Sequence, residues 1–278
     1  MQALKNVSLT IGKGMFGLLG QNGSGKSTLM KTIATLQNAD QGTITFIGIY
    51  VLKRSGEMRK VLGYLPQEFG VYPNISAEEL LLHIANMKGR VKKEERKKQV
   101  SGLLDQVNLY DVRKKYLNSY SGGMKQRFGI AQALIGNPQL IVVDEPTAGL
   151  DPMERNRFYN LRAEIGENKV VMLSTHIVED ASTLYNDMAI IGRGEVLLTG
   201  KPEEVEQSLR GKLLETPLGQ SELSHYKEQH KVISQRFHQG KMMITVVDDE
   251  FTDHAFNQKS PSLEDAYFNT LFNQEISA

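Results

Sequence analysis

The chain has 278 residues, of which 40% are hydrophobic, so it can build one large domain with a smaller addition around a buried core. Its formal net charge of +1 argues against nucleic acid or an anionic membrane surface as a dominant electrostatic partner. It contains no cysteine, which excludes a disulfide framework, and no apolar run approaches the roughly 18 residues that a membrane-spanning helix needs.

At the N-terminus, residues 1–6 lack the apolar core of a signal peptide, so we expect a cytoplasmic protein. Residues 4–11 alternate apolar and polar side chains, which predicts a half-buried strand. The apolar run at residues 15–19 predicts a second, buried strand, with Phe16 facing the core.

Residues 20–27, Gly-Gln-Asn-Gly-Ser-Gly-Lys-Ser, fit the phosphate-binding pattern G-x-x-x-x-G-K-[ST] at every fixed position. The predicted strand enters this loop and residues 28–36 predict a helix leaving it, as an anion site at a helix N-terminus requires. The glycines let backbone N–H groups turn inward around a phosphate. Lys26 would reach the β- and γ-phosphates and the Ser27 hydroxyl would ligate Mg²⁺, so we expect the chain to bind a nucleoside triphosphate.

Helices follow two further strand candidates, residues 43–47 and 61–65. Residues 76–79, Ser-Ala-Glu-Glu, form a capping box that predicts a helix start, and residues 92–107 predict a second helix. The lysine- and glutamate-rich run at its beginning could suggest nucleic-acid binding, but mixed signs at helical spacing are typical of a solvated face.

A Ser-Gly-Gly sequence at residues 121–123 precedes a helical stretch at 128–135. Such a helix start presents bare N–H groups and the positive end of the helix dipole, which makes it a second candidate anion site.

Strands alternate with helices again from residue 140, at 140–143, 170–174, 188–191 and 194–199, which predicts a parallel sheet covered by helices. Asp144 and Glu145 follow the first of these strands. Asp144 could hold Mg²⁺ through water, and Glu145 could polarise an attacking water as general base. Beyond about residue 205, a hairpin at 232–237 and 241–247 and a helix at 263–272 predict a small α+β addition.

These motifs together resemble the nucleotide-binding subunit of an ATP-binding cassette (ABC) transporter. Residues 20–27 match its Walker A motif, 140–144 Walker B, 121–126 the signature motif and 148–151 the D-loop. Gln67 matches the Q-loop and His176 the switch histidine. Taken alone, three of these residues would have an ordinary structural explanation. Gln67 could be a surface glutamine, His176 could be a histidine at a strand end, and Asp151 could be a helix N-cap before Pro152. The six motifs occur in the family's order between about residues 4 and 205.

The resemblance implies an α/β fold of the P-loop NTPase class: a RecA-like, mostly parallel sheet with flanking helices, an antiparallel β subdomain and an inserted helical subdomain. We expect an ATPase domain at residues 1–205, with the helical insertion at about 74–130, and a C-terminal α+β accessory region at 206–278.

The resemblance also implies a head-to-tail dimer of cassettes that encloses two molecules of ATP with Mg²⁺. Expected catalytic residues are Lys26, Glu145 and His176, and expected metal ligands are Ser27, Gln67 and Asp144. The expected nucleotide-binding residues are Gly20, Gln21, Asn22, Gly23, Ser24, Gly25, Lys26, Ser27, Thr28, Gln67, Ser121, Gly122, Gly123, Gln126 and Asp151.

Tyr120 and Met124, where the family more often has Leu and Gln, resemble the signature of cassettes that energise exporters. The implied partners are a second cassette, identical or different, and a separate membrane permease, contacted near residues 69–74. The chain would then sit on the inner face of the cell membrane through the permease. An importer subunit is a rival within this class. A regulatory cassette with little turnover, and a translation or DNA-repair protein of the family, are alternatives.

The family's adenine-stacking aromatic residue upstream of Walker A has no counterpart before Phe16. We expect either a truncated start or looser ATP binding, and favour truncation.

Overall fold

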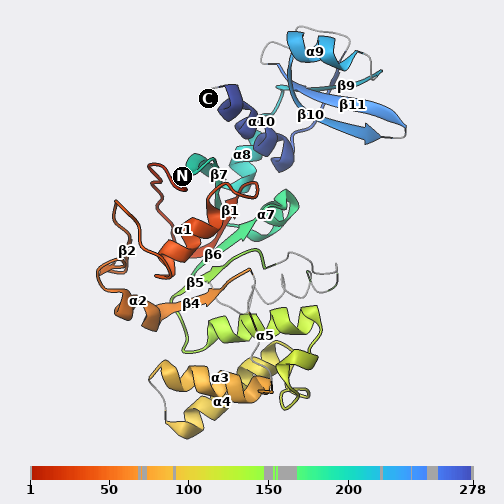
Figure 1. Ribbon diagram of the computed structural model, residues 1–278. Helices are drawn as coiled ribbons and strands as arrows, with labels where there is room; N and C mark the ends of the chain where they lie inside the picture. Colours follow the sequence, from red (N-terminus) through yellow and green to blue (C-terminus); the bar gives the residue numbers. More distant parts are fainter. Residues whose placement is uncertain are drawn as a thin grey trace.

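The computed structural model describes residues 2–67, 70, 74–89, 92–146, 153, 155, 168–219, 222–238, 240–248 and 256–276. Within these ranges a six-stranded sheet forms the centre of the molecule, helices α3, α4 and α5 lie at one end, and a smaller sheet lies at the other (Figure 1). The predicted residues 148–151 and 69, 71, 72 and 73 fall outside the described part of the chain.

The central sheet has the strand order β4-β5-β6-β1-β7-β8, in which the first five strands run parallel and β8 is antiparallel to β7. The five parallel strands are nearly continuous apolar runs, as is typical where both faces of a sheet are covered, whereas β8 at the edge is only partly buried. The parallel sheet predicted from the sequence is therefore confirmed. Its strands are β4 (Leu62–Leu65), β5 (Leu140–Val143), β6 (Val170–Thr175), β1 (Gly14–Leu19), β7 (Asp187–Gly192) and β8 (Glu195–Gly200).

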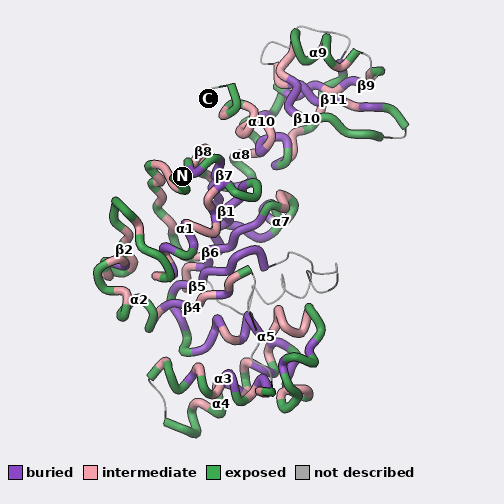
Figure 2. Tube along the Cα trace, in the orientation of Figure 1, coloured by how far each residue is buried: buried purple, intermediate pink, exposed green. Residues whose placement is uncertain are grey.

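Two hydrophobic clusters occupy the two faces of the sheet. On β1, Met15 and Leu19 enter one cluster and Phe16 and Leu18 enter the other, as the two-residue period of a strand requires. Phe16 is buried, so its predicted core position is confirmed. Figure 2 shows the central strands as a buried layer within an exposed outer surface.

The predicted strand at residues 4–11 does not form. The alternating apolar side chains are nevertheless half-buried and pack against one face of the sheet, and the Lys5 N–H donates to Gly194 O at 2.7 Å. The alternation of apolar and polar residues therefore predicted correctly which side chains of this segment face the core. A strand also needs a ladder of backbone hydrogen bonds to a neighbour, which this segment does not make within the described residues.

The expected antiparallel subdomain is represented by a small sheet of two strands, β2 (Thr45–Phe46) and β3 (Ile49–Tyr50), followed by helix α2 (Ser55–Val61). The predicted strand at residues 43–47 is therefore shorter than its apolar pattern indicated. The connection between the two strands, Ile47–Gly48, has positive φ at both residues, as a tight hairpin turn demands.

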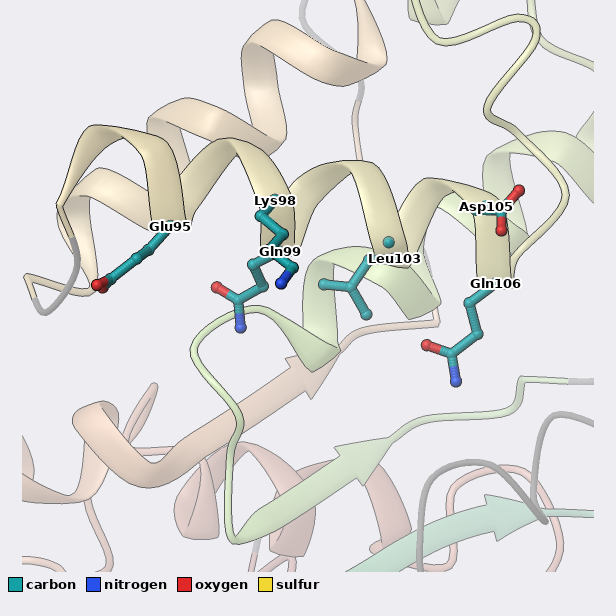
Figure 3. Close-up of a pocket in the computed structure, with 7 residues that line it drawn as sticks. Glu95, Lys98, Gln99, Leu103, Asp105 and Gln106 are labelled. Atoms are coloured by element: carbon teal, nitrogen blue, oxygen red, sulfur yellow. The ribbon is translucent and has the colours of Figure 1, made fainter.

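The inserted helices are α3 (Ala77–Met87), α4 (Lys93–Gln106), the short 3₁₀ turn η1 (Leu117–Ser119) and α5 (Gly122–Leu134). The capping box at α3 is confirmed, because Ser76 Oγ accepts from the Glu79 N–H and Glu79 Oε2 accepts from the Ser76 N–H. Along α4, Val100 and Leu104 are buried, whereas the charged side chains at its start are mostly exposed. Figure 3 shows Glu95, Lys98 and Gln99 projecting from this helix. The mixed-charge run is thus a solvated helix face, as expected.

The C-terminal part contains a four-stranded antiparallel sheet of order β10-β11-β9-β12. The predicted hairpin and final helix are confirmed, and the helix extends to Ile276. This helix packs back on the central sheet, where Leu263, Ala266 and Tyr267 join the same cluster as Met15 and Leu19. The elements are α7 (Val178–Leu184), α8 (Pro202–Gln207), β9 (Leu213–Leu218), α9 (Leu223–Gln229), β10 (Lys231–His238), β11 (Lys241–Val247), β12 (Asn257–Gln258) and α10 (Leu263–Ile276).

Candidate nucleotide-binding site

The glycine-rich loop lies between β1 and helix α1 (Lys26–Ile33), as the sequence predicted. Gly23 and Gly25 adopt φ of 80° and 109°, which side chains rarely allow, so glycine is required to turn the loop back on itself. No side chain caps the start of α1 and its first turn carries no acidic residue. Its first N–H groups are therefore available to an anion.

Lys26 is almost fully buried at the floor of this loop. Its Nζ donates to Gly20 O at 2.7 Å and to Gln21 O at 3.1 Å, and lies 3.7 Å from Glu145 Oε1. Burial lowers the pKa of Lys26, and the negative charges of Glu145 and Asp144 partly oppose that shift. Ser24 Oγ, also buried in the loop, has no hydrogen-bond partner within the described residues. A buried cation beside an unsatisfied hydroxyl is the chemistry that a phosphate would complete.

Glu145 follows β5, and its side chain is contacted by residues that follow the two neighbouring strands, β4 and β6. Gln67, after β4, donates its Nε2–H to Glu145 Oε2 at 3.0 Å. His176, after β6, places Nδ1 3.3 Å from the same oxygen. Because parallel strands end at one edge of the sheet, residues from distant parts of the sequence meet there. The structure thus brings together Lys26, Gln67, Glu145 and His176.

The adjacent carboxylate, Asp144, is 2% exposed and is held by a residue that the sequence reasoning missed. Ser174 Oγ donates to Asp144 Oδ1 and accepts from the Glu145 N–H at 2.9 Å. Burial, and then the charge of Asp144, raise the pKa of Tyr64 to about 12, so this phenol remains neutral beside the carboxylate.

The expected metal ligands suit Mg²⁺ in chemical type. They are a carboxylate, a hydroxyl and an amide, all oxygen donors once Gln67 turns its carbonyl oxygen to the ion. Ser27 and Gln67 line one cleft together with Glu145, and Asp144 immediately precedes Glu145 in the sequence. No cluster of three or more His, Cys, Asp or Glu side chains suited to a metal occurs in the described part of the chain.

A cleft of about 740 Å³ opens over the loop, and it includes residues that the sequence reasoning did not select. From the N-terminal segment come Gln2, Ala3 and Lys5, and from the β7–β8 turn comes Arg193. Sequence periodicity carries no signal for these positions, because they reach the cleft only through the tertiary fold. The remaining lining residues are Asn22, Gly23, Gly25, Lys26, Ser27, Thr28, Gln67 and Glu145.

The signature residues lie elsewhere. Ser121 caps α5 by accepting from the Met124 N–H at 3.3 Å, and Gly122 and Gly123 form the first turn of that helix. Gln126 Nε2 donates to Pro146 O at 2.8 Å, which ties α5 to the segment after Glu145. Ser121, Gly122 and Gly123 do not line the cleft of the phosphate loop in the same chain. Asp151 falls outside the described residues.

A glycine loop opening onto a helix N-terminus, with a buried lysine and strand-end carboxylates beside it, defines a P-loop nucleoside-triphosphate-binding protein. Residues 4–148 match the family model described as ABC transporter. The chain therefore belongs to the ABC transporter family, as one of its ATP-binding subunits.

Curated relatives agree with this assignment. The chain is 31% identical over 287 residues to the uncharacterized ABC transporter ATP-binding protein YxlF of Bacillus subtilis, covering 97% of this chain and 95% of that one. It is 32% identical over 270 residues to the probable multidrug ABC transporter ATP-binding protein YbhF of Escherichia coli. That alignment covers 92% of this chain but 46% of YbhF, so the chain spans less than half of that relative.

Solved structures show the same fold. The chain is 30% identical to the ATP-binding cassette MJ0796, seen as a dimer in a post-hydrolysis state bound to ADP and Pi. The TM-score is 0.65, over 72% of this chain and 90% of MJ0796.

Proposed function

We propose that this subunit hydrolyses ATP and uses the cycle of ATP binding and hydrolysis to drive a separate membrane permease, as an exporter. The observation that carries this proposal is the meeting of Lys26, Gln67, Glu145 and His176 at one edge of the sheet, next to the phosphate loop. A site that merely bound nucleotide would need the loop and lysine, but not a buried carboxylate held between an amide and an imidazole.

In the proposed reaction, the loop N–H groups and Lys26 bind the phosphates, and Ser27, Gln67 and Asp144 hold Mg²⁺. The ion would neutralise the charge that develops on the phosphate oxygens. Glu145 accepts a proton from the attacking water, and its hydrogen bond from Gln67 holds the carboxylate in place. His176 contacts the γ-phosphate and stabilises its charge.

We further propose that two cassettes enclose the nucleotide between them, with Ser121, Gly122 and Gly123 of one chain facing the phosphate loop of the other. Two observations support this arrangement: Ser121 and Gly122 at the start of α5 are exposed and do not line the chain's own cleft, and MJ0796 is dimeric. ATP would then join the two chains and hydrolysis would release them.

The direction of transport is inferred from the names of relatives. Besides YbhF, the chain is 35% identical over 210 residues to the linearmycin resistance ATP-binding protein LnrL of Bacillus subtilis. Across the part of the chain that the structure describes, no helix is both long enough and apolar enough to cross a bilayer. A separate permease would supply the path through the membrane and hold the cassette at its inner face.

The first test compares Lys26→Ala with Lys31→Ala, which removes an exposed lysine from the same helix. We expect Lys26→Ala to abolish ATP binding and phosphate release, and Lys31→Ala to change neither. Equal effects of the two variants would contradict the assigned site. Light scattering on Glu145→Gln with and without Mg·ATP then tests the dimer, which we expect to form only with nucleotide.

A further inference from the structure

Ser174 occupies a position that the reaction described above does not use. It lies on β6, next to β1 on one side and β5 on the other, and its side chain is 0% exposed. Its hydroxyl donates its single proton to Asp144 Oδ1 and accepts from the Glu145 N–H at 2.9 Å. One buried group therefore contacts both consecutive carboxylate residues, through the side chain of one and the backbone of the other.

The backbone of Glu145 explains why this contact is needed. Glu145 has a φ of 49°, a left-handed conformation that is uncommon for residues other than Gly, Asn and Asp. Such a conformation persists only where surrounding interactions fix it. The hydrogen bond from the Glu145 N–H to Ser174 is one of those interactions, and it turns the chain so that Glu145 points toward Lys26, Gln67 and His176.

The bond to Asp144 fixes the other carboxylate. Because Ser174 bonds to Oδ1, the second carboxylate oxygen of Asp144 would remain available to a cation. Partners of this kind, one step behind a metal ligand, orient the ligand, and their loss typically costs about 10- to 100-fold in metal affinity or activity.

We propose that Ser174 is a positioning residue that sets the Mg²⁺ affinity of the nucleotide complex, by orienting Asp144 and by fixing the backbone of Glu145. This inference rests on the proposed function, since it takes Asp144 as a residue that holds the ion.

The test is Ser174→Ala, with two readouts in purified full-length protein. The first is the affinity for ATP in EDTA, measured with a fluorescent ATP analogue. The second is Mn²⁺ binding to the protein–ATP complex, measured by electron paramagnetic resonance. We expect nucleotide affinity in EDTA to stay within about threefold of wild type, because the phosphate loop is untouched. Mn²⁺ affinity should fall about 10- to 100-fold.

Two further variants separate positioning from general stability. Thr245→Val removes another buried hydroxyl, in β11 of the C-terminal sheet, and should leave Mn²⁺ affinity unchanged. Ser174→Thr keeps the hydroxyl and should recover most of the Mn²⁺ affinity. Ser174→Cys, which keeps the shape with a weaker donor, should give an intermediate value, and it replaces Ser174→Ala if that variant does not fold.

Unchanged Mn²⁺ affinity in a folded Ser174→Ala or Ser174→Cys protein would overturn the proposal, and so would a loss equal to that of Thr245→Val. Failure of the proposed function would look different, because wild type itself would then bind ATP with Mn²⁺ but release no phosphate.

Discussion

Replacing Glu145 by glutamine removes a charge while keeping the shape of the side chain. In the structure, Oε2 accepts from Gln67 at 3.0 Å and lies 3.3 Å from His176, while Oε1 lies 3.7 Å from the Lys26 ammonium. The Glu145 side chain is 7% exposed, so solvent screens its charge weakly. An amide in its place offers one acceptor instead of two, and it cannot take a proton from water.

The magnitude follows from the role of a general base, which contributes about 10²- to 10⁴-fold to a rate. We therefore expect kcat for ATP hydrolysis to fall by that factor, or about 2.7–5.5 kcal/mol in activation free energy. ATP affinity should be retained or should rise, because Lys26 no longer has a carboxylate that competes with the phosphates.

The assay combines phosphate release at saturating Mg·ATP with equilibrium binding of a fluorescent ATP analogue. Glu203→Gln, an exposed glutamate of α8, serves as the matched control and should change neither quantity. A fall in kcat of less than tenfold would refute the assignment of Glu145 as base. So would a loss of binding as large as the loss of turnover.

Three further predictions concern stability and are measured by urea denaturation. Asp265→Ala should destabilise the protein by about 3 kcal/mol, since it removes the partner of Lys259 and the acceptor of the Ser262 N–H at the start of α10; exposed Glu264→Ala is its control. Gly17→Ala should lower the free energy of unfolding by about 1–3 kcal/mol or more, because its new Cβ would lie 2.0 Å from the ring of buried Tyr185. Gly56→Ala in α2 is the contrasting variant: its new Cβ meets no atom within 4 Å, so it should raise the free energy of unfolding by about 0.5–1 kcal/mol. Arg193→Asn should stabilise the protein by about 1 kcal/mol, because Arg193 has a φ of 47° in a two-residue turn that favours Asn. A lower free energy of unfolding in this variant would show that Arg193 makes a contact that offsets its backbone strain.

Much of the site was predictable because its residues occur in short, ordered motifs. The phosphate loop follows from eight adjacent residues and the elements that flank them, and its strand–loop–helix geometry is confirmed. Asp144 and Glu145 were identifiable because an apolar run ended in two carboxylates, and parallel strands deliver their ends to one edge. The assignment of Gln67 and His176 depended on the order of motifs, and the structure places both beside Glu145.

Hydrophobic alternation, in contrast, predicted burial better than secondary structure. At residues 4–11 it marked which side chains face the core, but a strand needs a neighbouring backbone, and one-dimensional periodicity contains no information about that neighbour.

The amino-acid sequence by itself determined the chemical class of this protein, because a phosphate loop is built from local backbone geometry that glycine permits. The tertiary structure alone decided which distant residues complete the site. Ser174 reached Asp144 and Glu145 through the packing of β6 against β5, and Arg193 and Lys5 reached the cleft through the β7–β8 turn and the N-terminal segment. These contacts join residues far apart in the chain, so only the folded backbone brings them together.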